Sequence, residues 1–169
     1  MQTIGLAIML SVVGGGLAVT TANANIVTEY DVAMINSLAA KSTQLSDDIL
    51  RSRRKVVGIA DDCMLRLALD VGNVSDHLQA EQMLVAIASS VQSNLDDNLA
   101  ADYTKTYTDH IISNLRTTRE SITQTLGISS CAASPIVMIE AQQLLSLVSQ
   151  TDAALRPLSR RIETSLRRR

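Results

Sequence analysis

Apolar residues recur mostly at steps of three or four positions along the first part of the chain, from residue 27 to residue 71. This spacing places them on one face of a helix. Gly72-Asn73 predicts the end of the segment, because glycine tolerates the left-handed conformation that ends helices. The pattern leaves open whether the segment is one long helix or breaks near Ser46-Asp47-Asp48. The apolar positions are Val27, Tyr30, Met34, Leu38, Leu45, Ile49, Val56, Ala60, Cys63 and Leu67.

Two further helices are predicted between residues 76 and 127. Ser75 or Asp76 is suited to cap the second helix, whose inner face carries Leu84, Ala88, Val91 and Leu95. The pattern weakens over residues 94–98, where Asn and Asp favour competing local hydrogen bonds, and predicts a turn. The third helix is predicted to end at Gly127, which with Ile128 fits a Schellman cap. Its apolar positions are Leu99, Tyr103, Tyr107, Ile111, Leu115, Ile122 and Leu126.

The last helix has the most regular pattern. After a predicted loop over residues 128–134, Ser134-Pro135 fits an N-cap and a first helical residue. Pro157 falls inside the pattern, but the apolar stripe keeps its phase across it, which predicts a kink and not an end. The stripe is Val137, Leu144, Thr151, Leu158 and Ser165, with Ala141, Val148, Leu155 and Ile162 four positions further on.

These elements predict an all-α protein. No segment alternates apolar and polar residues for long, so strands are not expected. With a turn near residues 94–98, four helices would run up, down, up and down. The expected fold is therefore an antiparallel four-helix bundle.

The amino-terminal residues predict where in or outside the cell the protein is located. Residues 1–24 hold no charged side chain, and an apolar stretch is followed by Ala22-Asn23-Ala24, an A-x-A site. We expect a signal peptide over residues 1–24, with residues 25–169 as one exported domain, periplasmic or secreted. The alternative is a retained anchor, because the stretch is about long enough to cross a bilayer of ~30 Å. Three consecutive glycines, Gly14 to Gly16, argue against it, and no second apolar span follows.

The two cysteines, Cys63 and Cys131, are consistent with an exported protein. An even number in an exported chain predicts a disulfide. Such a bridge also tests the bundle, because the loop after Gly127 would return to the end where the first helix stops, near Cys63. The alternative is two separate thiols buried as small apolar residues.

Composition and missing motifs exclude several classes of cofactor-binding and catalytic site. The chain has 169 residues, 46% of them hydrophobic, with no Phe, no Trp and three Tyr. It has no glycine-rich phosphate loop, no dinucleotide fingerprint, no G-x-S-x-G elbow and no haem-attachment motif. We therefore expect no cofactor and no enzymatic activity.

Two sets of residues are candidates for a ligand or metal site. His77 and Glu81 lie four positions apart, which places them on one helix face, although a solvated surface pair has the same spacing. Tyr103, Tyr107 and His110 share the third helix. They form either a ligand cluster or a row of rings at the edge of the core with polar tips in water.

Charge is distributed unevenly. Residues 151–169 hold six arginines against Asp152 and Glu163, whereas residues 25–150 hold nine basic and fifteen acidic side chains. A second basic run covers residues 51–55, midway along the predicted first helix. Arginine clusters bind carboxylates and phosphates, although a basic carboxyl terminus also complements a helix end. The six arginines are Arg156, Arg160, Arg161, Arg167, Arg168 and Arg169.

These features predict an exported protein that acts through its surface, on a partner protein or an anionic component of the cell envelope. The alternative is a bundle that binds a small ligand or a metal. Nucleic acid is not expected as a partner, because the chain has a formal net charge of −2 and few aromatic residues. The sequence does not indicate an oligomeric state.

Overall fold

The computed structural model describes residues 26–90 and 94–168. Within these ranges every regular element is a helix and no strand occurs, so the all-α prediction is confirmed. The helices are α1 (Glu29–Arg53), α2 (Ile59–Ser90), α3 (Asn94–Gly127), α4 (Ser129–Ala132) and α5 (Pro135–Arg167).

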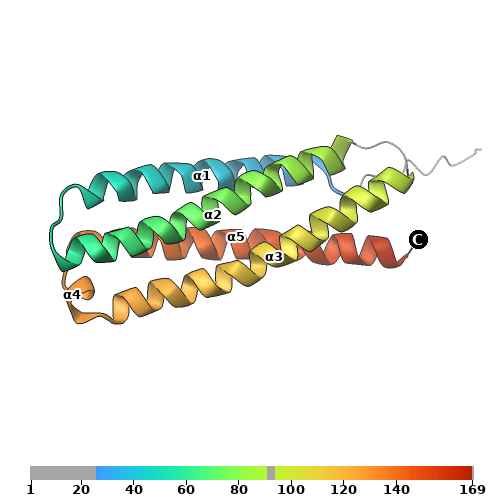
Figure 1. Ribbon diagram of the computed structural model, residues 1–169. Helices are drawn as coiled ribbons and strands as arrows, with labels where there is room; N and C mark the ends of the chain where they lie inside the picture. Colours follow the sequence, from blue (N-terminus) through green and yellow to red (C-terminus); the bar gives the residue numbers. More distant parts are fainter. Residues whose placement is uncertain (1–25, 91–93, 169) are drawn as a thin grey trace, which may run out of the picture.

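The four long helices lie side by side (Figure 1). The α1–α2 connection and α4 lie at one end, and the carboxyl terminus lies at the other. α1 contacts α2 and α5, and α3 also contacts α2 and α5. The helices enclose an aliphatic core, whose largest fully buried side chains include Ile35, Ile49, Met64, Leu67, Leu78, Ile111, Ile122 and Leu144.

α1 begins at a capping box. The Thr28 side chain accepts a hydrogen bond from the Asp31 backbone, and the Thr28 backbone donates to Asp31 Oδ2 at 2.8 Å. Two backbone N–H groups that have no partner inside the helix are thereby satisfied. Asp31 is only 1% exposed. Its second oxygen accepts a hydrogen bond from Arg161 of α5 at 2.5 Å, so the start of α1 is attached to α5.

The predicted end of the first helix is wrong. α1 stops at Arg53, and the chain turns at Gly58, the residue with a positive φ (63°) in the described part of the chain. α2 then passes through Gly72-Asn73 without interruption, so neither the predicted start near Asp76 nor a break near Ser46-Asp47-Asp48 occurs. Glycine inside a helix costs about 0.5–1 kcal/mol. Its neighbours Val71 and Val74 are buried, and their packing outweighs that cost.

The start of α3 and the cap at its end also differ from the prediction. Residues 94–98, where a turn was expected, are already helical. α3 does end at Gly127 as predicted, but Gly127 lacks the positive φ of a Schellman cap. α4 follows almost at once, with Ile128 as its N-cap, so the predicted loop over 128–134 contains a short helix. The side chains of Val91 and Leu95 lie outside the described residues.

The disulfide between Cys63 and Cys131 is present, with a Cα–Cα distance of 5.8 Å. It joins the start of α2 to α4. The sequence argument placed Cys63 near the end of the first helix, whereas it lies just after the α1–α2 connection. The end of α1 and the start of α2 lie at the same end of the molecule (Figure 1), so the expected pairing is present although the predicted helix boundary is wrong.

α5 follows its predicted pattern. Ser134 is the N-cap and Pro135 the first residue, and the helix continues through Pro157 to Arg167. The predicted kink stays a prediction. The buried stripe residues are Val137, Ala141, Leu144, Val148, Thr151, Leu155, Leu158 and Ile162.

The predicted signal peptide lies outside the described residues. Within those residues no helix is both long and apolar enough to span a membrane.

Candidate functional site

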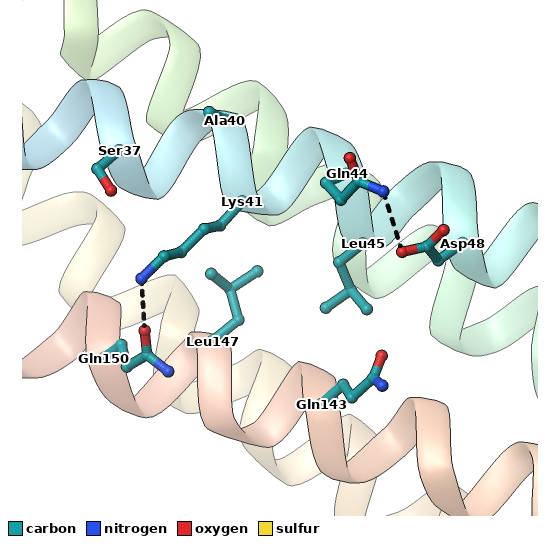
Figure 2. Close-up of a pocket in the computed structure, with 9 residues that line it drawn as sticks. All are labelled: Ser37, Ala40, Lys41, Gln44, Leu45, Asp48, Gln143, Leu147 and Gln150. Atoms are coloured by element: carbon teal, nitrogen blue, oxygen red, sulfur yellow. Dashed lines mark hydrogen bonds between the residues drawn. The ribbon is translucent and has the colours of Figure 1, made fainter.

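A groove of about 510 Å³ lies between α1 and α5 (Figure 2). Leu45 and Leu147 form its apolar part. Lys41 Nζ donates to Gln150 Oε1 at 3.2 Å, which links the two helices across it. No titratable cluster lines this groove, so it offers a surface for packing and no evident chemistry.

The side-chain cluster best suited to bind a ligand lies at the seam between α2 and α3. Tyr107, His110 and Asn114 follow one another at steps of three and four residues along α3, and therefore share one face. His77 of α2 meets that face. Its Nδ1 lies 3.1 Å from Tyr107 Oη, and its ring centroid lies 5.3 Å from that of His110.

Asn114 connects the two imidazoles. Its Nδ2 lies 2.8 Å from His77 Nε2 and 3.0 Å from His110 Nε2. An amide nitrogen has two hydrogens and donates both, so each Nε2 acts as an acceptor. His77 then carries its proton on Nδ1 and donates it to Tyr107 Oη. Burial lowers the pKa of His77, and the neighbouring His110 lowers it further, which agrees with a neutral imidazole.

A polar cleft of about 360 Å³ continues from this cluster along the seam. Asp70 lies in it and accepts a hydrogen bond from Ser121 Oγ at 2.9 Å. Burial raises the pKa of the Asp70 carboxyl, and the hydrogen bond from Ser121 opposes that rise. Donors and acceptors line the cleft, so it suits a small polar ligand. Its lining residues are Asp70, Asn73, His77, Asn114, Thr117, Thr118 and Ser121.

Glu81 is not on the surface, so the interpretation as a solvated His77–Glu81 pair is wrong. Glu81 is fully buried, and Thr108 Oγ1 donates to its Oε1 at 2.5 Å. Its Oε2 has no hydrogen-bond partner within the described residues. Burial raises the pKa of Glu81 to about 7. His77 contacts Tyr107 and Asn114 of α3, whereas Glu81 accepts from Thr108, so the two side chains have different hydrogen-bond partners.

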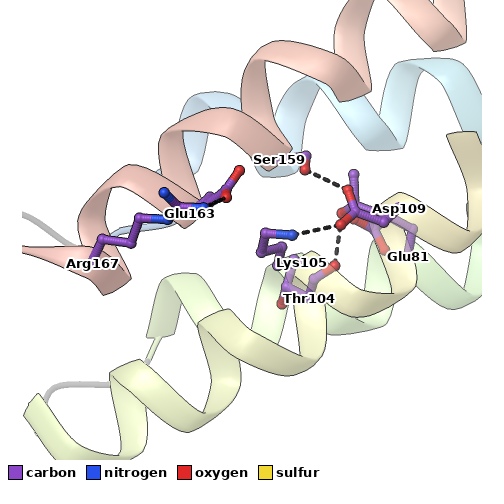
Figure 3. Close-up of polar contacts among 8 residues, drawn as sticks. Glu81, Thr104, Lys105, Asp109, Ser159, Glu163 and Arg167 are labelled. Carbon is purple, nitrogen blue, oxygen red and sulfur yellow. Dashed lines mark hydrogen bonds and ion pairs between the residues drawn. The ribbon is translucent and has the colours of Figure 1, made fainter.

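A second polar network lies beside Glu81 between α3 and α5 (Figure 3). Asp109 pairs with Lys105 Nζ at 2.6 Å and accepts a hydrogen bond from Ser159 Oγ at 2.5 Å. Burial raises the pKa of Asp109, but the hydrogen bonds from Lys105 and Ser159 outweigh that effect and lower it. The network ties α3 to α5.

Tyr103 does not join His77, Tyr107 and His110. It is 63% exposed. Over residues 26–90 and 94–168, no three His, Cys, Asp or Glu side chains are grouped to hold a metal ion. The structure thus combines His77 with Tyr107 and His110, which the sequence had assigned to two separate candidates. Asn114 and Asp70 were missed, because nothing in the sequence distinguishes them from other polar residues of a helix surface.

The arginine-rich end is helical over the described residues, but three of its six arginines are already paired. Arg156 pairs with Asp152 at 2.8 Å, Arg161 with Asp31 at 2.5 Å, and Arg167 with Glu163 at 2.5 Å. Arg160 and Arg168 form no ion pair with the described residues, and Arg169 lies outside them. The predicted array of displayed arginines therefore offers less unpaired charge than its composition indicates.

The second basic run lies at the end of α1 and not along its middle. Arg51 pairs with Asp48 at 3.3 Å, and Arg53 pairs with Asp61 at 2.6 Å. The hydrogen bond to Asp61 raises the pKa of Arg53, and the same bond lowers that of Asp61. The Arg53–Asp61 pair spans the connection between α1 and α2, whereas the Arg51–Asp48 pair lies within α1.

The outer face of α2 carries an apolar row that the sequence analysis missed. Leu65, Leu69, Met83 and Ile87 are 38%, 62%, 65% and 57% exposed. At ~100° per residue, positions separated by 4, 18 and 22 residues fall on nearly the same face. We call these four side chains the α2 stripe. Because α2 is also apolar toward the core, its pattern shows no clear polar side.

No family model matches this chain, and neither a curated protein nor a solved structure matches it.

Proposed function

We propose that this chain is an exported up-and-down four-helix bundle that acts without catalysis, by binding a partner protein through the α2 stripe. The A-x-A site and the disulfide support export, because a disulfide persists in an oxidising compartment. The end of α2 and the start of α3 lie at the end of the molecule opposite the α1–α2 connection and α4 (Figure 1), which supports the topology.

The exposed α2 stripe is the observation that carries the proposal. A surface helix normally presents polar residues to water, and one that is apolar all round is normally covered. The exposed parts of the four side chains amount to about two whole aliphatic side chains, and covering them is worth roughly 3–6 kcal/mol. If the stripe is a binding surface, this explains why the monomer exposes apolar area whose burial would be favourable.

The arginine end supports an anionic envelope component less well. Carboxylates of the same chain hold Arg156, Arg161 and Arg167. An anion would have to displace these carboxylates, and Asp31, the partner of Arg161, is buried. Two described arginines without an ion pair make a smaller site than the α2 stripe.

The proposal is tested by the size of the native complex. The wild-type protein, extracted gently from the envelope of the exporting host, is expected to migrate as a complex heavier than one chain. Leu69→Lys with Met83→Lys is expected to release the monomer. Ile139→Lys changes an equally exposed residue, 53% exposed on α5, and is expected to leave the complex intact. A wild-type protein that migrates as one chain would contradict the proposal.

A second candidate function is supported by the convergence of His77 and His110 on Asn114. Two imidazoles that accept from one amide form a site where a small polar ligand or a metal ion could replace the amide hydrogens. Titration with Zn²⁺ or Cu²⁺, followed by the imidazole NMR signals, tests it. Saturable binding that is lost in His77→Ala and reversed by a chelator would favour this function. Unchanged imidazole signals would leave the cluster a structural network.

A further inference from the structure

The α2 stripe is arranged symmetrically about Asp76. Leu65 and Ile87 lie eleven residues either side of it, and Leu69 and Met83 lie seven either side. Gly72 and Ala80, the two small residues of this face, lie four either side. Read in either direction, the face presents two large apolar residues, one small residue, Asp76, one small residue and two large apolar residues.

This order suits packing about a two-fold axis. In such an interface, a contact of residue i with residue j of the other copy is matched by a contact of j with i, and only a residue on the axis meets its own copy. An axis through Asp76, with the two α2 helices antiparallel, sets Leu65 against Ile87 and Leu69 against Met83 of the other copy. All these positions lie within about 40° of Asp76 around the helix. The face therefore sets apolar side chains against apolar side chains, and small residues against small ones.

We propose that the partner covering the α2 stripe is a second copy of this chain, bound antiparallel about a two-fold axis at Asp76. This inference rests on the proposed function, because it identifies the partner at the same surface.

Gly72 supports a closely approaching helix. A Cβ atom at this position would meet nothing within 4 Å, so the protein's own packing does not require glycine there. Glycine in the middle of a helix is destabilising relative to alanine. Its presence is explained if a second helix backbone approaches here, about one helical turn from the symmetry axis.

The charges beside the stripe disfavour an anionic membrane as its occupant. Asp62 and Asp76 are exposed on α2, and Arg66 is the basic residue near them. Carboxylates repel an acidic headgroup surface, because both are negatively charged.

In the proposed dimer Asp76 meets its own copy, which limits affinity. The stripe is ~33 Å long and ~10 Å wide, so two facing stripes bury roughly 700 Å², less than a standard interface. We therefore expect a concentration-dependent dimer.

Sedimentation equilibrium of the protein recovered from the exporting host measures this dimer. The wild-type protein is expected to pass from monomer to dimer as concentration rises. Leu69→Lys with Met83→Lys should abolish the dimer, and Ile139→Lys should not change it. Asp76→Asn removes the repulsion at the axis and is expected to strengthen dimerisation about five- to tenfold. A wild-type monomer at every concentration, or a dimer unaffected by the stripe variant, would overturn the inference.

A cysteine at the axis tests the arrangement itself. Asp76→Cys places two thiols next to each other across the two-fold axis, and mild oxidation is expected to join two chains. Ser113→Cys, an exposed control position on α3, should stay uncrosslinked. If Asp76→Cys stays monomeric and its thiol reacts freely, the inference fails but a different protein partner remains. If that thiol is unreactive in a monomer, the chain covers its own stripe and both proposals fail.

Discussion

At the scale of single residues, burial separates side chains that the sequence presents alike. His77 and Glu81 have the spacing of a surface pair, yet His77 lies at the α2–α3 seam and Glu81 lies in the core. The rotation of α2 decides this, and it follows from packing against three other helices. The sequence identified His77, Tyr107 and His110 as residues of interest, but only the structure shows that they meet.

Glu81 is expected to make stability depend on pH. Its folded pKa of about 7 lies above the ordinary value of 4.5, so the folded state binds this proton more tightly than the unfolded state. The resulting stability is complete below pH 4.5 and is lost as pH rises through 7, by about 3 kcal/mol at most. Glu81→Gln keeps an acceptor for Thr108 and should remove this loss. Urea unfolding at pH 5 and pH 8 measures it.

The matched control is Glu120→Gln, at an exposed carboxylate paired with Arg116. It should retain the wild-type difference between the two pH values. If Glu81→Gln retains that difference as well, Glu81 is not the group responsible.

Two neighbouring arginines are expected to differ in their effect on stability. Arg161→Gln leaves the buried Asp31 carboxylate without its cation and should lower the free energy of unfolding by about 1–2 kcal/mol. Arg160→Gln removes an exposed charge with no ion pair in the described residues and should change it by less than about 0.5 kcal/mol. Thermal unfolding compares the two. Equal effects would mean that the link between α1 and α5 contributes little.

At the scale of helices, predictability depended on whether one face alone was apolar. α5 was predicted closely, since its apolar residues form one stripe and Ser134-Pro135 marks its start. The α1–α2 boundary was misplaced, because Gly58 and Gly72 each stand in segments with apolar neighbours. Only packing decides which glycine turns the chain. The α2 stripe was missed for a related reason, because apolar residues on both sides of α2 hide its outer row.

The two glycines are expected to respond in opposite directions to the same change. Gly58 has a φ of 63°, so Gly58→Ala should destabilise the protein by about 1–2 kcal/mol. Gly72 is helical, so Gly72→Ala should stabilise the monomer by about 0.5–1 kcal/mol. A Cβ atom meets nothing within 4 Å at either site, so steric clashes do not complicate the comparison. Chemical denaturation at low protein concentration measures both; a shift in the same direction would contradict the assignment of the turn.

At the scale of the whole molecule, the disulfide and the helix arrangement explain each other. The bridge joins α2 to α4 over a sequence separation of 68 residues, and both cysteines lie at the end that holds the α1–α2 connection. The sequence predicted the pairing from the even number of cysteines. It did not predict α4, a helix of four residues that holds Cys131 at the correct position.

Removing the bridge is expected to lower stability substantially without changing the fold. Cys63→Ser with Cys131→Ser should cost about 4 kcal/mol, because the unfolded chain gains the freedom of the opened loop. Urea unfolding of this variant is compared with that of the oxidised wild-type protein, and helix content by circular dichroism should be similar. A reducing agent should destabilise the wild-type protein and leave the variant unchanged. Two free thiols in the denatured wild-type protein would exclude the bridge.

The central claim is that a partner covers the α2 stripe in the compartment where the protein acts. The most direct measurement is the rate at which a thiol reagent labels Leu69→Cys in the cell that produces the protein and in dilute purified protein, with Ile139→Cys as the control at a similarly exposed position. The account predicts that the cysteine at position 69 is protected in the cell and reactive after dilution, while the cysteine at position 139 reacts in both. Equal reactivity of the two cysteines in the cell would contradict it.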